Sequence, residues 1–233
     1  MALGYGYQQT GSVNDTLAQA SANTFMARVY RWMFAGLTVT GLVAMYVATQ
    51  PALAMQAAQH MWLLFGAELA MVFGLSFFAH KMSAAMAATL FLAYAVLNGL
   101  TFSTLFFVFQ LGSIVNAFFL TAAVFGAMSI YGTYTKRDLS SWRGFLYGGL
   151  FGILGAMLLG FFFHSALLQF LINVAMVVVF TGLAAYDQQK LRKFHASSGY
   201  SSVGSLAIVG ALMLYLDFIN LFIALLNLTG KRR

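Results

Sequence analysis

The sequence predicts an all-α integral membrane protein with seven transmembrane helices. Of its 233 residues, 61% are hydrophobic and only 7% are charged, and the mean hydropathy is +0.84. A soluble domain carries about a quarter charged residues, so twelve basic and five acidic side chains cannot cover the surface of a soluble protein of this length. The composition therefore excludes a cytosolic enzyme, a nucleic-acid-binding module and a disordered protein.

Seven apolar runs are long enough to cross a hydrocarbon core, which takes about 20 residues of helix. None of them has the strand-like alternation of a β-barrel. In chain order, the predicted spans are Trp32–Thr49, Trp62–Ala79, Ala84–Phe109, Ile114–Tyr134, Gly144–Phe163, Ala166–Tyr186 and Leu206–Leu228.

Short polar segments separate these apolar runs and mark where each predicted span ends. The first break contains the only proline, Pro51, and the last is a longer connection rich in Ser and Lys. The weakest break is His164–Ser165, but the apolar run around it is too long for a single span. In order, the breaks are Gln50–Met61, His80–Ser83, Gln110–Ser113, Thr135–Arg143, His164–Ser165 and Asp187–Ser205.

The chain is predicted to have one transmembrane domain, residues 27–233, preceded by a polar N-terminal tail, residues 1–26. Lys and Arg residues set the topology, because they accumulate on the cytoplasmic side. With seven spans, nine basic residues fall on the side of the N-terminus and only the three of Lys231–Arg233 on the other. We therefore expect a cytoplasmic N-terminus.

Three of the five acidic residues lie within or at the edge of an apolar run: Glu68, Asp187 and Asp217. An Asp at the centre of a membrane helix costs about 2.5–3.5 kcal/mol on insertion scales, so such residues are functional candidates. No Lys or Arg lies deep in a predicted span to neutralise them. Asp138, which follows two basic residues in a loop, is expected to be a solvated or helix-capping residue.

Other polar residues recur at helical spacing. In the seventh span Asp217, Asn220 and Asn227 share one face, as do Asn173 and Asp187 in the sixth. The third span carries a shorter stripe of Tyr94, Asn98 and Thr101. Such stripes are consistent with a polar axis inside the bundle, and equally with interhelical hydrogen bonds that serve packing. The chain has no Cys and no metal-ligand spacing, so no resident cofactor is expected.

Two segments resemble the Bax inhibitor-1 (transmembrane Bax inhibitor motif) family. The residues Leu214-Tyr215-Leu216-Asp217-Phe218-Ile219-Asn220-Leu221-Phe222 are similar to its C-terminal signature, and Ala185-Tyr186-Asp187-Gln188-Gln189-Lys190-Leu191 to its motif at the end of the sixth helix. The segments Thr135–Ser140 and Asn98–Thr101 also resemble bacterial members. The resemblance covers almost the whole chain from Ala27 to Arg233.

The resemblance implies a seven-helix fold in which the last helix is central, in a bacterial inner membrane. It also implies a pH-sensitive calcium leak, with Asp187 and Asp217 as the sensor and Ca²⁺ and protons as the transported or sensed ions. Two neighbouring carboxylates in a low dielectric share a proton. Ca²⁺ prefers oxygen ligands, which Asp187, Asp217, Asn220, Glu68 and water could supply transiently.

Two other functions remain open from the residues alone. The chain could be a regulatory membrane protein that binds other membrane proteins. It could also be an intramembrane aspartyl protease, but the Gly-x-Gly-Asp motif and a later Pro-Ala-Leu are absent, so we expect no enzymatic activity.

Counted along straight helices, Asp187 and Asp217 would differ in depth by on the order of 10 Å.

Overall fold

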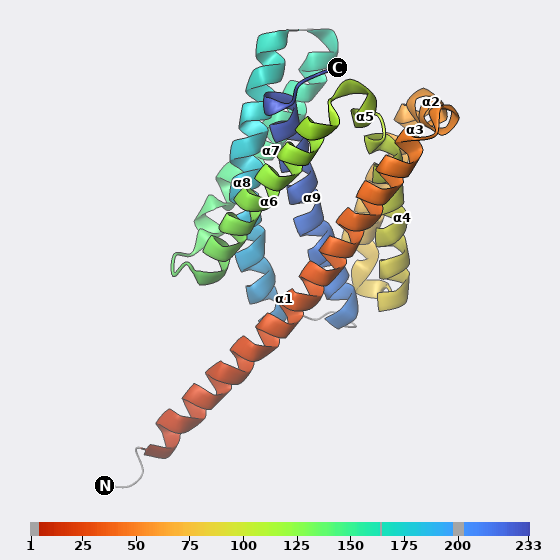
Figure 1. Cartoon of the computed structure of the whole chain (residues 1–233). Coiled ribbons are helices and arrows are strands. Elements are labelled where there is room, and N and C mark those ends of the chain that lie inside the picture. Colours follow the sequence, from red (N-terminus) through yellow and green to blue (C-terminus); the bar gives the residue numbers. More distant parts are fainter. Residues whose placement is uncertain (1–4, 164, 198–202) are drawn as a thin grey trace.

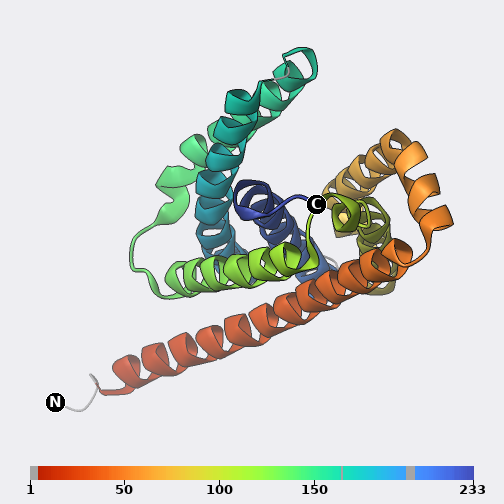
Figure 2. The same ribbon diagram turned by 45° about the horizontal axis from the view of Figure 1, so that its top comes forward.

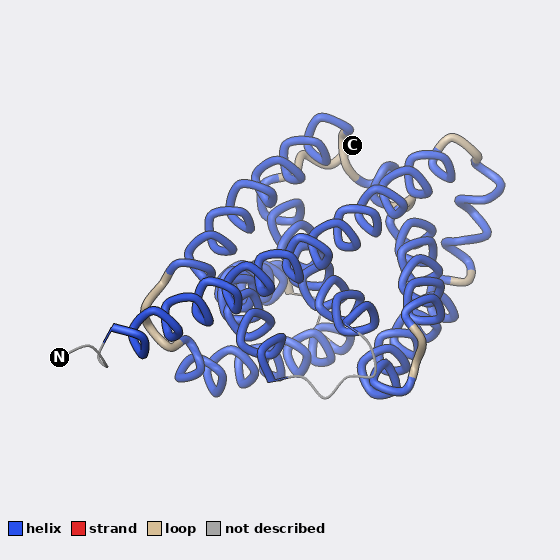
Figure 3. Tube along the Cα trace, turned by 90° about the horizontal axis from the view of Figure 1, so that it is seen from below, coloured by secondary structure: helices blue, strands red, loops and turns tan. Residues whose placement is uncertain are grey.

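The computed structural model describes residues 5–163, 165–197 and 203–233, and these form a helical bundle (Figure 1). Figure 3 shows helices joined by short loops throughout the described chain. The α-helices are α1 (Tyr5–Ala48), α2 (Pro51–Gln59), α3 (Met61–Phe78), α4 (Ala84–Phe102), α5 (Leu105–Val108), α6 (Leu111–Tyr134), α7 (Arg143–Phe162), α8 (Ala166–Ser197) and α9 (Val203–Thr229), with short 3₁₀ helices η1 (Ala79–Lys81) and η2 (Leu139–Trp142).

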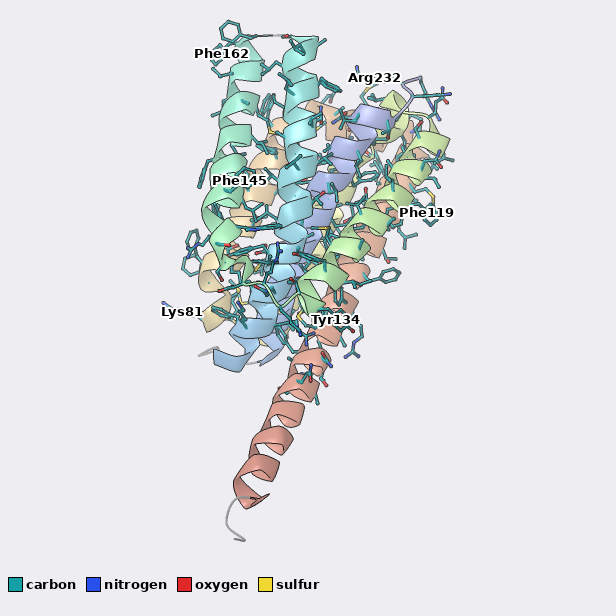
Figure 4. The ribbon with its side chains drawn as sticks, turned by 90° about the vertical axis from the view of Figure 1, so that its left-hand side faces the viewer. Lys81, Phe119, Tyr134, Phe145, Phe162 and Arg232 are labelled. Carbon is teal, nitrogen blue, oxygen red and sulfur yellow. The ribbon has the colours of Figure 1, made fainter. Side chains whose placement is uncertain are left out.

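Seven of the described segments are long and apolar enough to cross a membrane, which confirms the predicted number of spans. The protein is therefore a multi-pass integral membrane protein. Large aromatic side chains such as Phe119 and Phe162 lie on the outer surface of the bundle (Figure 4), where they are 66% and 80% exposed. In the order of the chain, the spans are Gln19–Ala48, Met61–Phe78, Ala84–Val108, Leu111–Tyr134, Leu139–Gly160, Ala166–Phe194 and Gly204–Thr229.

The last helix, α9, is the centre of the bundle, as predicted. In its most apolar stretch 78% of the residues are buried, against 33% or fewer in each of the other spans. Helices α1, α4, α6 and α8 pack around it, and Figure 2 shows the dark blue α9 enclosed by them. The polar side chains of α9, such as Tyr215 and Asp217, favour such a position, because inside a membrane their partners must come from neighbouring helices.

Two helices extend beyond the predicted spans. Helix α1 begins at Tyr5, so most of the segment expected to be a polar tail is part of a long helix that projects from the bundle (Figure 1). Helix α8 was predicted to end its span at Tyr186, but it continues to Ser197. Asp187 therefore lies inside a helix rather than at its end. The extra turns of α8 are held by contacts with neighbouring elements, which are described below.

A single tyrosine joins the central helix to two of its neighbours. Tyr215 on α9 is fully buried, and its hydroxyl lies 2.7 Å from Oγ1 of Thr40 on α1. Its ring packs edge-on against Phe91 and Tyr94 of α4. Because buried polar groups need partners inside the membrane, this hydrogen bond helps to fix the rotation of α9 in the bundle.

Candidate functional site

Asp187 on α8 and Asp217 on α9 are both buried, with 6% and 4% of their surface exposed. Helices α8 and α9 pack against each other, and the charge of Asp187 is close enough to act on the carboxyl of Asp217. Within the described residues, neither Oδ1 of Asp187 nor Oδ2 of Asp217 has a hydrogen-bond partner. The structure thus buries the two predicted aspartates on packed helices, within electrostatic range of each other, and leaves one oxygen of each without a hydrogen bond.

Asp187 and Asp217 lie at different depths in the bundle. Asp187 lies seven residues before Phe194, where the sixth span ends, and Asp217 lies thirteen residues after Gly204, where the seventh begins. At 1.5 Å per residue these positions are about 10 and 20 Å from the same end of the bundle. The offset of about 10 Å is the one expected from the sequence, and it is small enough for charges in a low dielectric to interact.

Lys190 lies beside the pair, which corrects the expectation that the acidic residues lack a cationic partner. Its Nζ is 3.8 Å from Oδ1 of Asp187, three residues earlier on α8. The same Nζ donates a hydrogen bond of 3.3 Å to the hydroxyl of Tyr147 on α7 and lies about 6 Å from the ring centres of Tyr147 and Tyr186. Aromatic faces attract a cation at this distance, so the two rings help to hold the ammonium group near Asp187.

The two glutamines between Asp187 and Lys190 attach α8 to its neighbours. Gln188 accepts a hydrogen bond of 2.8 Å from the hydroxyl of Tyr30 on α1, and its amide donates one of 2.8 Å to Thr133 on α6. Gln189 accepts from the backbone N–H of Leu139 and donates to the carbonyl of Arg137, both at 2.9 Å. One turn of α8 therefore connects three other parts of the bundle around Asp187.

Asp138 caps the short helix η2, as its position in the loop predicted. It also forms an ion pair. Its side chain accepts a hydrogen bond of 3.1 Å from the N–H of Ser140 at the start of η2, and one of 2.6 Å from Nζ of Lys193 on α8. The hydrogen bond from Lys193, followed by that from Ser140, lowers the pKa of Asp138 to about 2. This pair fastens the loop before η2 to the end of α8.

Glu68 belongs to a different polar cluster from the aspartates. It lies on α3, which packs mainly against α4, and its Oε1 accepts a hydrogen bond of 2.6 Å from Thr101 on α4. Tyr94 of α4 and Tyr215 of α9 also lie within electrostatic range of Glu68. None of its interactions in the described chain is with Asp187 or Asp217. The structure therefore does not place Glu68 where it could complete a site with the pair.

The asparagines of the predicted stripes bond to their own helices, and one pair also bonds across two helices. Asn220 donates a hydrogen bond of 2.8 Å to the carbonyl of Leu216 in its own helix. Asn227 on α9 donates one of 3.3 Å to Asn173 on α8, near the far end of the helix pair. The sequence allowed either a polar axis or interhelical hydrogen bonds, and the Asn173–Asn227 pair is an interhelical hydrogen bond.

Sequence reasoning missed Lys190 and Tyr147 as neighbours of the aspartates. The signal for Lys190 was present, because residues three apart on a helix share a face and Lys190 follows Asp187 at that spacing. No local pattern could indicate Tyr147, which comes from another helix. Within the described residues, no group of three or more His, Asp or Glu lies together as a metal site would require.

The comparisons with known proteins identify the family. The family model described as "Inhibitor of apoptosis-promoting Bax1" matches residues 22–233. The chain belongs to the Bax inhibitor-1 family. Among its family relatives, inner membrane protein YbhL of Escherichia coli K12 is 42% identical over 228 residues, which cover 94% of this chain and 97% of that protein. An uncharacterized protein of Deinococcus radiodurans is 46% identical over 211 residues, covering 90% and 91% of the two chains.

Proposed function

We propose that this protein is a pH-sensitive Ca²⁺ leak channel of the bacterial inner membrane, in which Asp187 and Asp217 form the gate. The observation that carries the proposal is the pair of unbonded carboxyl oxygens, Asp187 Oδ1 and Asp217 Oδ2, on two packed helices. Buried polar atoms are nearly always hydrogen-bonded, and an exception needs an explanation. Inside a membrane, that explanation is most often proton or ion binding.

A proton bound by the pair keeps the channel closed. Two carboxylates in a low dielectric repel each other, so one shared proton stabilises the packing of α8 against α9. The other groups facing Asp187 are Lys190 on α8 and, next to that ammonium, the hydroxyl of Tyr147. Lys190 offsets one negative charge but not two, so loss of the shared proton leaves a net negative site between the helices.

A negative site of this kind attracts Ca²⁺ from either side of the membrane. Ca²⁺ takes six to eight oxygen ligands, whereas the pair supplies two carboxylates and water must supply the rest. An ion held by so few protein ligands dissociates readily, which suits conduction better than storage. Lys190 competes with the cation for Asp187, and this competition further weakens Ca²⁺ binding.

The relatives support the proposed inner-membrane location, and the distribution of charge supports the proposed orientation. YbhL is an inner membrane protein by name, and its sequence covers nearly the whole of this chain. Lys81 and Tyr134 lie at one end of the bundle, and Arg232 and Phe162 lie at the other (Figure 4). The first end carries most of the basic residues, which supports a cytoplasmic N-terminus.

The test is Ca²⁺ flux into liposomes that contain the purified protein and a fluorescent Ca²⁺ indicator, measured over a pH series. We expect Asp187→Asn and Asp217→Asn each to weaken the pH response, because Asn keeps the shape and removes the titration. The double variant should be no worse than the more severe single variant, as is usual for residues in one network. Glu68→Gln is the matched control and should have a small effect, because its cluster is separate.

Three outcomes would overturn the proposal. Flux absent at every pH, beside a working ionophore control, would favour a regulatory protein that binds other membrane proteins. Cleavage of a membrane-embedded peptide would favour an aspartyl protease. Additive effects of the two Asp→Asn variants would show that Asp187 and Asp217 act independently and that they share no proton.

A further inference from the structure

A groove of about 540 Å³ lies between α1, α6 and α8, away from the aspartate pair. Its polar end is lined by Tyr30 of α1, Ser129 and Thr133 of α6, and Gln188 and Arg192 of α8. With Asn23 and Tyr134, the groove collects seven hydrogen-bonding side chains from three helices.

Two of these side chains have unused bonding capacity. Among the described residues, the hydroxyl of Ser129 has only a weak contact, with the hydroxyl of Tyr30, although the residue is only 5% exposed. The guanidinium of Arg192 makes no hydrogen bond or ion pair within the described part of the chain. Its basic neighbours on α8 differ, because Lys190 pairs with Asp187 and Lys193 with Asp138. Within the described residues, the groove thus holds a cation without an ion pair beside a buried hydroxyl with one weak contact, and such a pair can bind an anion.

The other end of the groove is apolar and lies on the outer surface of the bundle. It is lined by Met26 of α1 and by Phe125 and Ile130 of α6, and Ile130 is 62% exposed. The groove therefore joins an anion-binding end to an apolar wall that faces the lipid. This combination matches an amphipathic molecule, with a charged headgroup at one end and a hydrocarbon chain at the other.

We infer that this groove binds an anionic phospholipid, with its phosphate held by Arg192 and Ser129 and one acyl chain along the wall formed by α1 and α6. Arg forms charge-assisted hydrogen bonds with phosphate oxygens, and the Ser129 hydroxyl can donate one more. Tyr30 and Thr133 are positioned by Gln188, so the polar end is already ordered by contacts on either side. The inference does not depend on ion conduction.

The experiment is a lipid titration of the full-length protein in detergent, with bound lipid counted by native mass spectrometry. We expect phosphatidylglycerol to bind more tightly than phosphatidylcholine, whose headgroup has no net charge. Arg192→Gln should weaken phosphatidylglycerol binding about tenfold, and Ser129→Ala about threefold, as expected for charged and neutral hydrogen bonds. Arg28→Gln removes an equal charge from an exposed residue outside the groove, and should change binding by less than about twofold.

Several results would overturn the inference. One is equal binding of phosphatidylglycerol by the wild type and Arg192→Gln, and another is equal binding of the two lipids. Displacement of phosphatidylglycerol by inorganic phosphate alone, with the same loss in Arg192→Gln, would mean that the site takes a free anion. If Arg192→Gln does not fold, Ser129→Ala decides, since it removes one hydroxyl whose only described side-chain contact is a weak one with Tyr30. Unchanged binding by Ser129→Ala would then refute the assignment.

Discussion

Gly132 on α6 lies against the backbone of α8 at Ala185, which is two residues before Asp187. A Cβ at this position would be 3.0 Å from the carbonyl carbon and the Cα of Ala185, and its closest neighbour would be the Ala185 carbonyl oxygen. These atoms belong to a helix backbone and cannot rotate away, so α6 and α8 would have to separate. Overpacking of this kind costs about 1–3 kcal/mol.

We therefore expect Gly132→Ala to lower the free energy of unfolding by about 1–3 kcal/mol, measured by denaturant or SDS titration in mixed micelles. Gly126→Ala is the matched control on the same helix, because a Cβ there meets nothing within 4 Å. That control should be neutral or slightly stabilising, since Ala favours helix over Gly. If both variants unfold at the same denaturant concentration, the close approach of α6 and α8 at Gly132 is wrong.

The two remaining predictions concern topology and the surface ion pair. A reporter that is active only in the cytoplasm should be inactive when fused after Arg233, because seven spans place the termini on opposite sides; an active fusion would contradict seven spans with a cytoplasmic N-terminus. Asp138 has its pKa lowered to about 2 from 3.8, so its pairing with Lys193 stabilises the fold above about pH 4, and this contribution is lost as the pH falls toward 2. The thermal stability of Asp138→Asn should therefore be below that of the wild type at neutral pH and equal to it near pH 2; a difference independent of pH would exclude this charge effect.

The number and approximate positions of the membrane spans could be predicted because the bilayer imposes a simple rule. Every span needs enough apolar residues to cross the hydrocarbon layer, and its backbone must be hydrogen-bonded internally. The ends of the spans were less predictable. Helix α8 continues past Asp187 because Gln188, Gln189 and Lys193 each contact other elements, and those partners are distant in the sequence.

The candidate site was predicted in part. Asp187 and Asp217 were selected because acidic residues are costly in a membrane, which is a property of each residue alone. Whether Glu68 joins them depends on which helices pack together and on their rotation. Since α3 packs against α4, Glu68 bonds to Thr101 instead. The groove with Arg192 could not be predicted, because its polar end requires three helices.

The sequence by itself determined the membrane environment, the seven spans and the acidic residues that need an explanation, because these depend on composition and on distances along one helix. Only the tertiary structure decided which polar side chains meet. It placed Lys190 beside Asp187, separated Glu68 from the pair, and brought Arg192 and Ser129 together in a common groove. The physical reason is that a membrane helix must have its polar groups satisfied by neighbouring helices, and the packing that satisfies them involves residues far apart in the chain.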